Sequence, residues 1–305
     1  METPDYLTAQ NVVGPEGLPE SSRGRKPPVS APPRASPGGA AEFEYEFIFH
    51  HNSMKSAFTL IELLVVAAIV AILIGLSLPV ISQVKIATAR AISVRSLSQL
   101  MTGGRLYLGD HNNQLWPYQQ DTTAGTQWWF GFETWQSQGM PEGQRTCDYS
   151  QGPLGPYVIA SGGIKTDPAF LQYSPRLKPK YQDGNYGYGY NTVLAADSAG
   201  NPRNALQVAL PSEMIVFATC AQVNTWEAPA SPNNPMIEEF YMITDSTAFA
   251  TAHFRHGGDA LAAFLDGSVR ALSMATDMQP GSQNMLIPSA NIGRFNPSYI
   301  RQAGW

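Results

Sequence analysis

The longest apolar run of the chain covers residues 58–81, FTLIELLVVAAIVAILIGLSLPVI, and contains a single charged residue, Glu62. The next charge along the chain is Lys85. A bilayer core of about 30 Å needs about 20 apolar residues in a helix. The pattern therefore predicts a membrane-spanning helix over 58–81. A carboxylate inside such a span is costly in hydrocarbon, so Glu62 indicates a binding partner and a function.

After this run the pattern becomes amphipathic. Over residues 82–110 apolar residues recur every three or four positions, while Lys85, Arg90 and Arg95 occupy other faces. This periodicity predicts that the membrane helix continues into a second half that packs on a head. Pro79 lies inside the helix and removes one backbone hydrogen bond, which predicts a kink or a locally melted turn.

Residues 111–305 read as a loop-rich β head without internal repeats. The segment TQWWFGFETW at 126–135 holds three Trp and two Phe, and such a cluster is more often core, or a cover over the helix, than a ligand platform. Short strands are predicted where apolar runs lie between turn residues, at 152–160, 186–191, 214–220 and 240–244.

The clearest strand signal lies near the C-terminus, at residues 256–272. The runs ALAAFL and SVRAL are joined by Asp266 and Gly267, and Asp-Gly favours a two-residue hairpin turn in which both residues have positive φ. A β-hairpin is predicted here. The predicted fold class is α+β, with one long N-terminal helix packed on an antiparallel sheet.

Residues 1–53 are rich in Pro, Ser, Gly and charge and show neither helical nor strand periodicity. This composition predicts disorder.

The chain has a net charge of -5, and residues 58–305 carry 14 basic and 17 acidic side chains, a net of -3. Such a balance argues against nucleic acid as the main partner. With only 14% charged residues, the chain is typical of an extracytoplasmic protein with many loops.

The only two cysteines of the sequence are Cys147 and Cys220. Outside the cytoplasm they could form a disulfide, which would contribute about 4 kcal/mol in the chain-entropy model. The alternative is two separate thiols, since Cys220 ends the apolar run MIVFATC and fits a plain core position. The sequence leaves both open.

Residues 54–57, MKSA, followed by FTLIELLVVAAIVAIL, resemble the processing site of prepilins and type II secretion pseudopilins. The resemblance implies that a prepilin peptidase cuts between Ala57 and Phe58 and methylates the new amine of Phe58. It also implies that Glu62 pairs with the amino terminus of a neighbouring subunit during filament assembly. The family usually has Gly where this chain has Ala57. Residues 54–57 form a complete short leader, so we expect Met54 to be the true start and 1–53 to be an upstream extension.

An ordinary signal anchor or an uncleaved secretory signal is the alternative, but it needs only apolarity and gives Glu62 no reason to be present.

The two indications of membrane orientation conflict. Upstream of the span only Lys55 lies close, while three basic residues follow it, so a count of positive charges places the downstream part in the cytoplasm. The resemblance implies the opposite, a single-pass protein of the bacterial inner membrane with its head in the periplasm or exported, and we follow the resemblance.

A second signature resembles a prepilin-type group in which a His is followed after nine residues by Asp-Gly. Here these residues are His256, Asp266 and Gly267. The group often has Cys-Pro where this chain has Asp167 and Pro168, so a disulfide or metal role at that point is not expected.

The sequence contains few residues whose pattern indicates catalysis or metal binding. His253, His256 and Asp259 could form a metal set, but they lie in a Gly-rich loop with no third His nearby, and a structural role in which His256 holds the hairpin is favoured. Some pseudopilin heads bind calcium through loop carboxylates, which makes Asp245, Asp259 and Asp266 weak candidates; no other cofactor is expected. No nucleophile elbow, phosphate loop or HExxH motif is present, so an enzyme is not predicted.

The sequence thus predicts a structural pseudopilin-like subunit of a type II secretion pseudopilus or a type IV pilus-like filament. Its expected partners are the prepilin peptidase, other pseudopilin subunits and the inner membrane. The alternative is a surface-binding minor pilin whose head captures DNA, sugar or a surface. Fold and export route do not distinguish the two. An anchored enzyme is a third class, for which the sequence offers no site.

Overall fold

The computed structural model describes residues 58–159, 164, 166–173, 175–182, 187–196, 200–244, 246, 249–276 and 286–302, without the side chain of Pro79. The predictions for residues 1–53, for the leader 54–57 with Ala57, and for Asp245 lie outside the described residues. All helices and strands belong to one compact unit, Thr59–Trp305.

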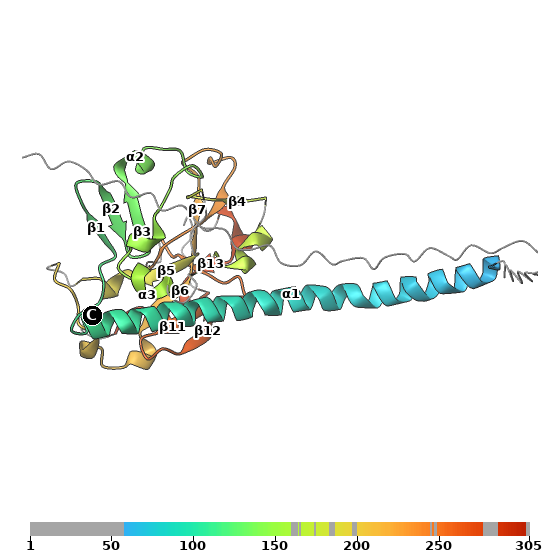
Figure 1. The fold of residues 1–305 in the computed structure, drawn as a ribbon, viewed down its shortest axis with the longest axis horizontal. Helices are drawn as coiled ribbons and strands as arrows, with labels where there is room; N and C mark the ends of the chain where they lie inside the picture. Colours follow the sequence, from blue (N-terminus) through green and yellow to red (C-terminus); the bar gives the residue numbers. More distant parts are fainter. Residues whose placement is uncertain are drawn as a thin grey trace, which may run out of the picture. The chain divides into compact units, whose positions relative to one another are not determined.

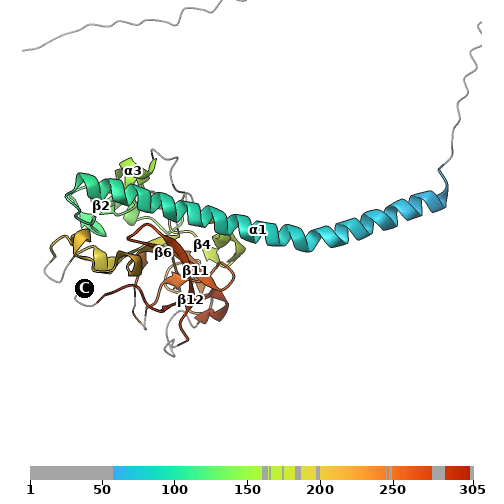
Figure 2. The same cartoon turned by 90° about the horizontal axis from the view of Figure 1, so that it is seen from below.

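The first element is the helix α1, Leu60–Asp110, which is 51 residues long. It runs through Pro79 as continuous helix, so the melted turn predicted there does not form. Proline removes only one helical hydrogen bond, and the apolar residues around it have no other structure to adopt. Figure 2 shows α1 bending gently part-way along its length, and a kink at Pro79 stays a prediction.

Among the described residues, the strands of the head form four sheets. The main sheet has the strand order β14-β12-β11-β6-β5-β9, and its strands are Phe295–Asn296, Val269–Met274, Asp259–Phe264, Ile215–Thr219, Tyr188–Asn191 and Met242–Ile243. All its pairs are antiparallel except β5 with β9. A three-stranded antiparallel sheet holds β1 (Gln119–Asp121), β2 (Gly125–Trp128) and β3 (Gly131–Thr134).

The other two sheets are smaller. One has the order β4-β8-β7 and consists of Leu177–Lys178, Met236–Glu239 and Ala221–Asn224; the other pairs β10, Ala252–His253, with β13, Ile292–Gly293. Short helices connect these strands. They are α2 (Trp135–Gln138), α3 (Gly155–Ile159), and the 3-10 turns η1 (Tyr149–Gln151), η2 (Pro168–Tyr173), η3 (Thr192–Leu194), η4 (Ala205–Gln207), η5 (Pro211–Glu213) and η7 (Pro288–Ala290). The long helix and the antiparallel sheet of the predicted α+β fold are confirmed.

The second half of α1 packs on the main sheet, as both views show (Figures 1 and 2). Its buried side chains Leu97, Leu100 and Met101 join a core cluster that includes Leu261 and Ala263 of β11. The alternate residues of β11 belong to a second core cluster on the other face of the sheet. Because both faces are buried, the strand reads as an unbroken apolar run rather than an alternating one.

A glycine pair in α1 allows the head to approach the helix closely. A Cβ at Gly103 would lie 2.8 Å from Cγ2 of Val158, and a Cβ at Gly104 would lie 2.8 Å from the buried ring of Trp116. Val158 belongs to α3, in the segment predicted as a strand at 152–160. That prediction was wrong, because prolines at 153 and 156 lack the N–H that a strand ladder needs, whereas proline is tolerated in the first turn of a helix.

The other predicted strands are found in part or in full. Run 214–220 forms β6, run 186–191 contains β5, and run 240–244 contains the two-residue β9.

The aromatic segment 126–135 forms the β2–β3 hairpin. Trp129 and Phe130, between these strands, lie in the core cluster beneath α1, which confirms the core interpretation, while Trp135 stays 45% exposed.

The two cysteines are free thiols, so the disulfide alternative is wrong and the alternative of two separate thiols holds. They lie in different clusters. Cys147 packs beside Gly131, whereas Cys220 lies in the core beside Gly189 and its thiol donates to the carbonyl of Phe240 at 2.7 Å. Burial raises the pKa of both thiols, which keeps them protonated and unreactive.

The C-terminal hairpin is formed by β11 and β12. Its turn differs from the prediction. The N–H of Phe264 donates to the carbonyl of Ser268 at 2.9 Å and that of Gly267 donates to the carbonyl of Phe264 at 2.8 Å, so the loop has three residues. Gly267 has φ +87°, whereas Asp266 is not among the residues with positive φ. This is a type I turn followed by a left-handed glycine, the common three-residue hairpin.

We predict that Gly267→Ala destabilises the head. A side chain at positive φ costs about 1–2 kcal/mol, and the added Cβ would also displace the guanidinium of Arg105, which contacts the carbonyl of Asp266. Gly109→Ala is the matched control, because this exposed helical glycine has no neighbour in the way and should gain about 0.5–1 kcal/mol. Thermal unfolding of the full chain in detergent measures both, and an unchanged melting temperature for Gly267→Ala would contradict the turn assignment.

Candidate functional site

The start of α1 is closed by a reciprocal pair of hydrogen bonds between Thr59 and Glu62. The backbone N–H of Glu62 donates to Thr59 Oγ1 at 3.3 Å, and Glu62 Oε2 accepts from the backbone N–H of Thr59 at 2.8 Å and from its hydroxyl at 2.9 Å. This is a capping box, which satisfies donors that the first helical turn would leave free. Glu62 is therefore hydrogen-bonded within its own subunit.

The helix that follows presents apolar side chains on every side. Large hydrophobic side chains from Phe58 to Ile81 are 46–81% exposed, and none of them packs on the head. Among the described residues α1 is the one helix long and apolar enough to cross a membrane. A helix that is apolar all round needs lipid or other helices around it. The geometry thus consists of an unpartnered apolar rod with one carboxylate at its first turn.

Comparison with known proteins agrees with this geometry. Residues 52–78 match the family described as the prokaryotic N-terminal methylation motif. The match supports a prepilin-type pilin or pseudopilin. Processing by a prepilin peptidase, assembly with other pilin subunits and a single-pass place in the inner membrane are consistent with it. The search of curated proteins and of solved structures finds no match.

A second cluster of polar groups lies in the head, around Asp167. Its carboxylate accepts from Nε of Arg255 at 2.9 Å and lies 3.1 Å from Nε2 of His256. The guanidinium also donates to the carbonyls of Gly187 at 2.7 Å and Cys220 at 3.2 Å. All three charged or titratable side chains are almost fully buried. Burial alone would raise the pKa of Asp167, but Arg255 and His256 hold it well below its usual value.

This cluster revises the role predicted for His256. Its backbone N–H closes the tight turn before β11 by donating to the carbonyl of Asp259 at 3.0 Å, but its imidazole contacts Asp167 instead of the hairpin loop. From the sequence, Asp167 stood out only because it lies where the similar group of proteins often has the Cys of Cys-Pro. Arg255 was not singled out, although a basic residue directly before His256 was the available signal.

The predicted metal candidates have other partners. His253 is fully buried, its Nδ1 lies 3.0 Å from Arg255, and burial keeps its pKa well below the usual value. Asp259 lies 3.7 Å from Arg90 of α1, and Asp266 accepts from the N–H and hydroxyl of Ser268 at 2.9 and 2.7 Å. Among the described residues no three His, Cys, Asp or Glu side chains converge on one point. A calcium site stays a prediction.

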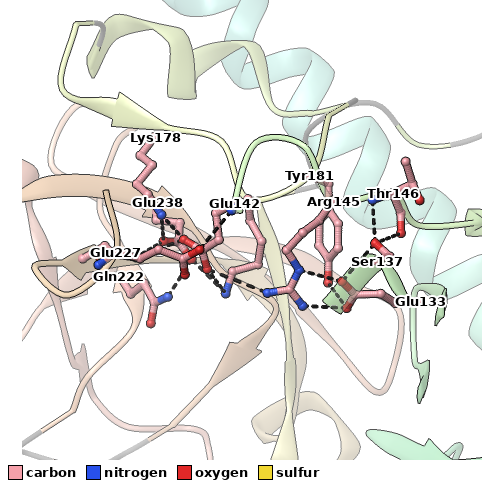
Figure 3. A network of polar contacts seen from close by, with 12 residues as sticks. Glu133, Ser137, Glu142, Arg145, Thr146, Lys178, Tyr181, Gln222, Glu227 and Glu238 are labelled. Atoms are coloured by element: carbon pink, nitrogen blue, oxygen red, sulfur yellow. Dashed lines mark hydrogen bonds and ion pairs between the residues drawn. The ribbon is translucent and has the colours of Figure 1, made fainter. Parts of the chain in front are cut away.

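A larger buried network joins β3, the segment after α2, and the β4-β8-β7 sheet (Figure 3). Glu133 accepts from Nε and Nη2 of Arg145 at 2.6 and 2.8 Å and from the hydroxyl of Tyr181 at 3.1 Å. Sequence analysis missed this pair. The bidentate geometry, with both partners buried or half-buried, fixes the segment that follows α2 against β3.

The other end of the network holds two more carboxylates between two lysines. Lys180 lies 2.8 Å from Glu238 and 3.4 Å from Glu142, and Lys178 contacts both carboxylates. Burial alone would raise the pKa of Glu238, but Lys180 and the amide of Asn224 hold it below its usual value. The carboxylates of Glu133, Glu142 and Glu238 are each matched by a cation, so these ion pairs serve to hold the loops against the strands.

We predict that Asp167→Asn destabilises the protein by about 3–5 kcal/mol, because it leaves the Arg255 guanidinium buried without a counter-charge. The folded pKa of Asp167 lies below the unfolded value of about 3.9. The stability it contributes is therefore fully present above that pH and is lost as pH falls through the folded pKa. Chemical unfolding of the full chain between neutral and acidic pH measures this.

The exposed Asp148→Asn is the control, since its carboxylate bonds only to exposed neighbours. A variant Asp167→Asn whose unfolding free energy equals that of the wild type, with the same loss in acid, would show that the pair does not hold the head together.

Proposed function

We propose that this chain is a structural subunit of a type II secretion pseudopilus or a type IV pilus-like filament, and that it is not an enzyme. The prepilin peptidase cuts between Ala57 and Phe58 and methylates the new amine. The subunit is held in the bacterial inner membrane by α1, with its head in the periplasm, until it joins the filament. The matched methylation motif, the exposed apolar helix and the capped carboxylate support this proposal.

The observation that carries the proposal is the place of Glu62. It is the one charge between Phe58 and Lys85, and apart from its partner Thr59 the side chains beside it along the helix are apolar and exposed. In a low dielectric a carboxylate and an ammonium attract strongly, and the pair offsets a desolvation cost that a single charge could not. The new Phe58 amine of a neighbouring subunit supplies that partner and sets the axial register of the helices.

Processing is tested by N-terminal sequencing of the mature protein in cells with and without the prepilin peptidase. We expect Phe58 as an N-methylated first residue only when the peptidase is present. A mature protein that keeps residues 54–57 in peptidase-positive cells would overturn the proposal.

Assembly is tested by Glu62→Gln, which removes the charge but keeps a side chain of the same size. We expect unchanged membrane insertion and processing. The amount of filament recovered by shearing should fall about tenfold or more, because a loss of about 1.4 kcal/mol in assembly free energy is enough for a tenfold change. Glu62→Ala should do the same. Glu213→Ala, an exposed acid of η5, is the control with normal assembly. Normal incorporation of Glu62→Gln would show that the charge does not drive assembly.

Thr59→Val separates the cap from the charge. It removes the hydroxyl that bonds Glu62 and should cost about 1 kcal/mol of helix stability, as loss of an N-cap does. Because the carboxylate remains, we expect filament formation to be retained. A loss of filaments as large as that of Glu62→Gln would mean that Glu62 acts through the cap alone.

A further inference from the structure

A groove of about 450 Å³ opens at the end of the head where α1 stops. Tyr107 lies 26 positions beyond Ile81, so at 1.5 Å per residue the groove is about 40 Å along the helix from the membrane span. Figures 1 and 2 both show α3 and the β1–β2 region beside this end of α1. The groove therefore faces away from the membrane.

The groove is lined by polar and aromatic groups. Its polar lining consists of three glutamines, a serine, two tyrosines and a histidine, and its walls are aromatic rings and prolines. Among the described lining residues none is Asp, Glu, Lys or Arg. Phosphates of a nucleic acid are held by Lys and Arg, so this surface does not suit DNA or RNA. A neutral ligand with many hydroxyl groups fits it better.

Two carboxylates behind the lining orient its polar groups as acceptors. The hydroxyl of Tyr157 donates to Asp110 at 2.8 Å, and the hydroxyl of Ser150 and the amide of Gln151 each donate to Asp148 at 2.6 Å. A hydroxyl has one proton, so once this is donated its oxygen can only accept. Those bonds also lower the pKa of Asp148, so its carboxylate stays ionised and remains an acceptor for both donors.

A glutamine and an aromatic wall complete the arrangement. The amide of Gln127 donates to the carbonyl of Gln151 at 2.7 Å, which leaves its oxygen as an acceptor. The ring of Tyr107 stacks on His111 at 3.8 Å between centroids, and the ring of Tyr157 meets Tyr107 edge-on at 6.0 Å. Pockets with apolar aromatic walls and a few fixed polar groups are typical of small-ligand sites. Here the wall suits the C–H face of a sugar ring, and the acceptors suit its hydroxyls.

We propose that this groove binds a neutral saccharide at the tip of the head. The proposal goes beyond the filament role, and its failure would leave the assembly function of Glu62 untouched. A neighbouring subunit seated in the groove is the main competing occupant. It would need to supply N–H or O–H donors to match the oriented oxygens of Tyr157 and Ser150.

The test uses the full chain in a detergent without a sugar headgroup, because maltoside or glucoside detergents would compete. The neutral probes are cellohexaose, maltohexaose and chitohexaose; the anionic probes are a heparin hexasaccharide and a single-stranded DNA oligomer. Titration calorimetry is expected to show saturable binding of at least one neutral probe, and weaker or undetectable binding of both anions.

Two groove variants and one control locate the site. Tyr157→Phe combined with Ser150→Ala removes two oriented acceptors and should weaken the neutral probe about tenfold or more. Gln120→Ala, an exposed lining residue, should weaken it about threefold. Gln136→Ala, an exposed glutamine of α2 outside the groove, should bind as the wild type does. Unfolding curves establish that each variant is folded.

Three results would overturn the proposal. The first is that no neutral probe shows saturable binding at concentrations up to about 10 mM, which lies far above the highest dissociation constant of interest. The second is tighter binding of heparin or DNA than of any neutral probe. The third is unchanged affinity in the Tyr157→Phe, Ser150→Ala variant, which would place a bound saccharide elsewhere on the head.

Discussion

The whole structure depends on one helix that must satisfy two environments. In a membrane the backbone polar groups have to be bonded within the segment, and α1 meets this condition as an uninterrupted helix except for the one hydrogen bond that Pro79 removes. Its first half then exposes apolar side chains all round, while its second half buries one face, with Leu97 and Leu100 almost fully covered by the head. The same element is the candidate membrane span and a wall of the core, so the head cannot separate from the helix without exposing Leu97, Leu100 and Met101.

The capping box changes how the carboxylate of Glu62 is to be understood. A charge alone in hydrocarbon would be very costly, but Thr59 gives it two donors inside the subunit before any neighbour arrives. In the assembly that we propose, this carboxylate exchanges hydrogen-bond partners, and a bare charge is not buried.

Sequence periodicity predicted the elements that depend on local pattern. The span, the amphipathic continuation, β6 and the C-terminal hairpin follow from runs and spacing that each element carries within itself. Contacts between distant segments were not predictable in this way. Asp167 and Arg255 are 88 positions apart, and nothing near either residue indicates the other. The helix α3 was missed because a short apolar run has no period long enough to separate strand from helix.

The buried ion pairs are best explained by the shortness of the strands. A head whose strands are two to six residues long gains little register from ladders alone, and much of its chain is irregular. A buried ion pair adds little net stability, but a wrong register would leave its charges unmatched at a cost of several kcal/mol. The Glu133–Arg145 pair and the Glu142, Glu238, Lys178 and Lys180 group join segments from β3 to β8. They therefore act by excluding alternative arrangements of the loops between these strands.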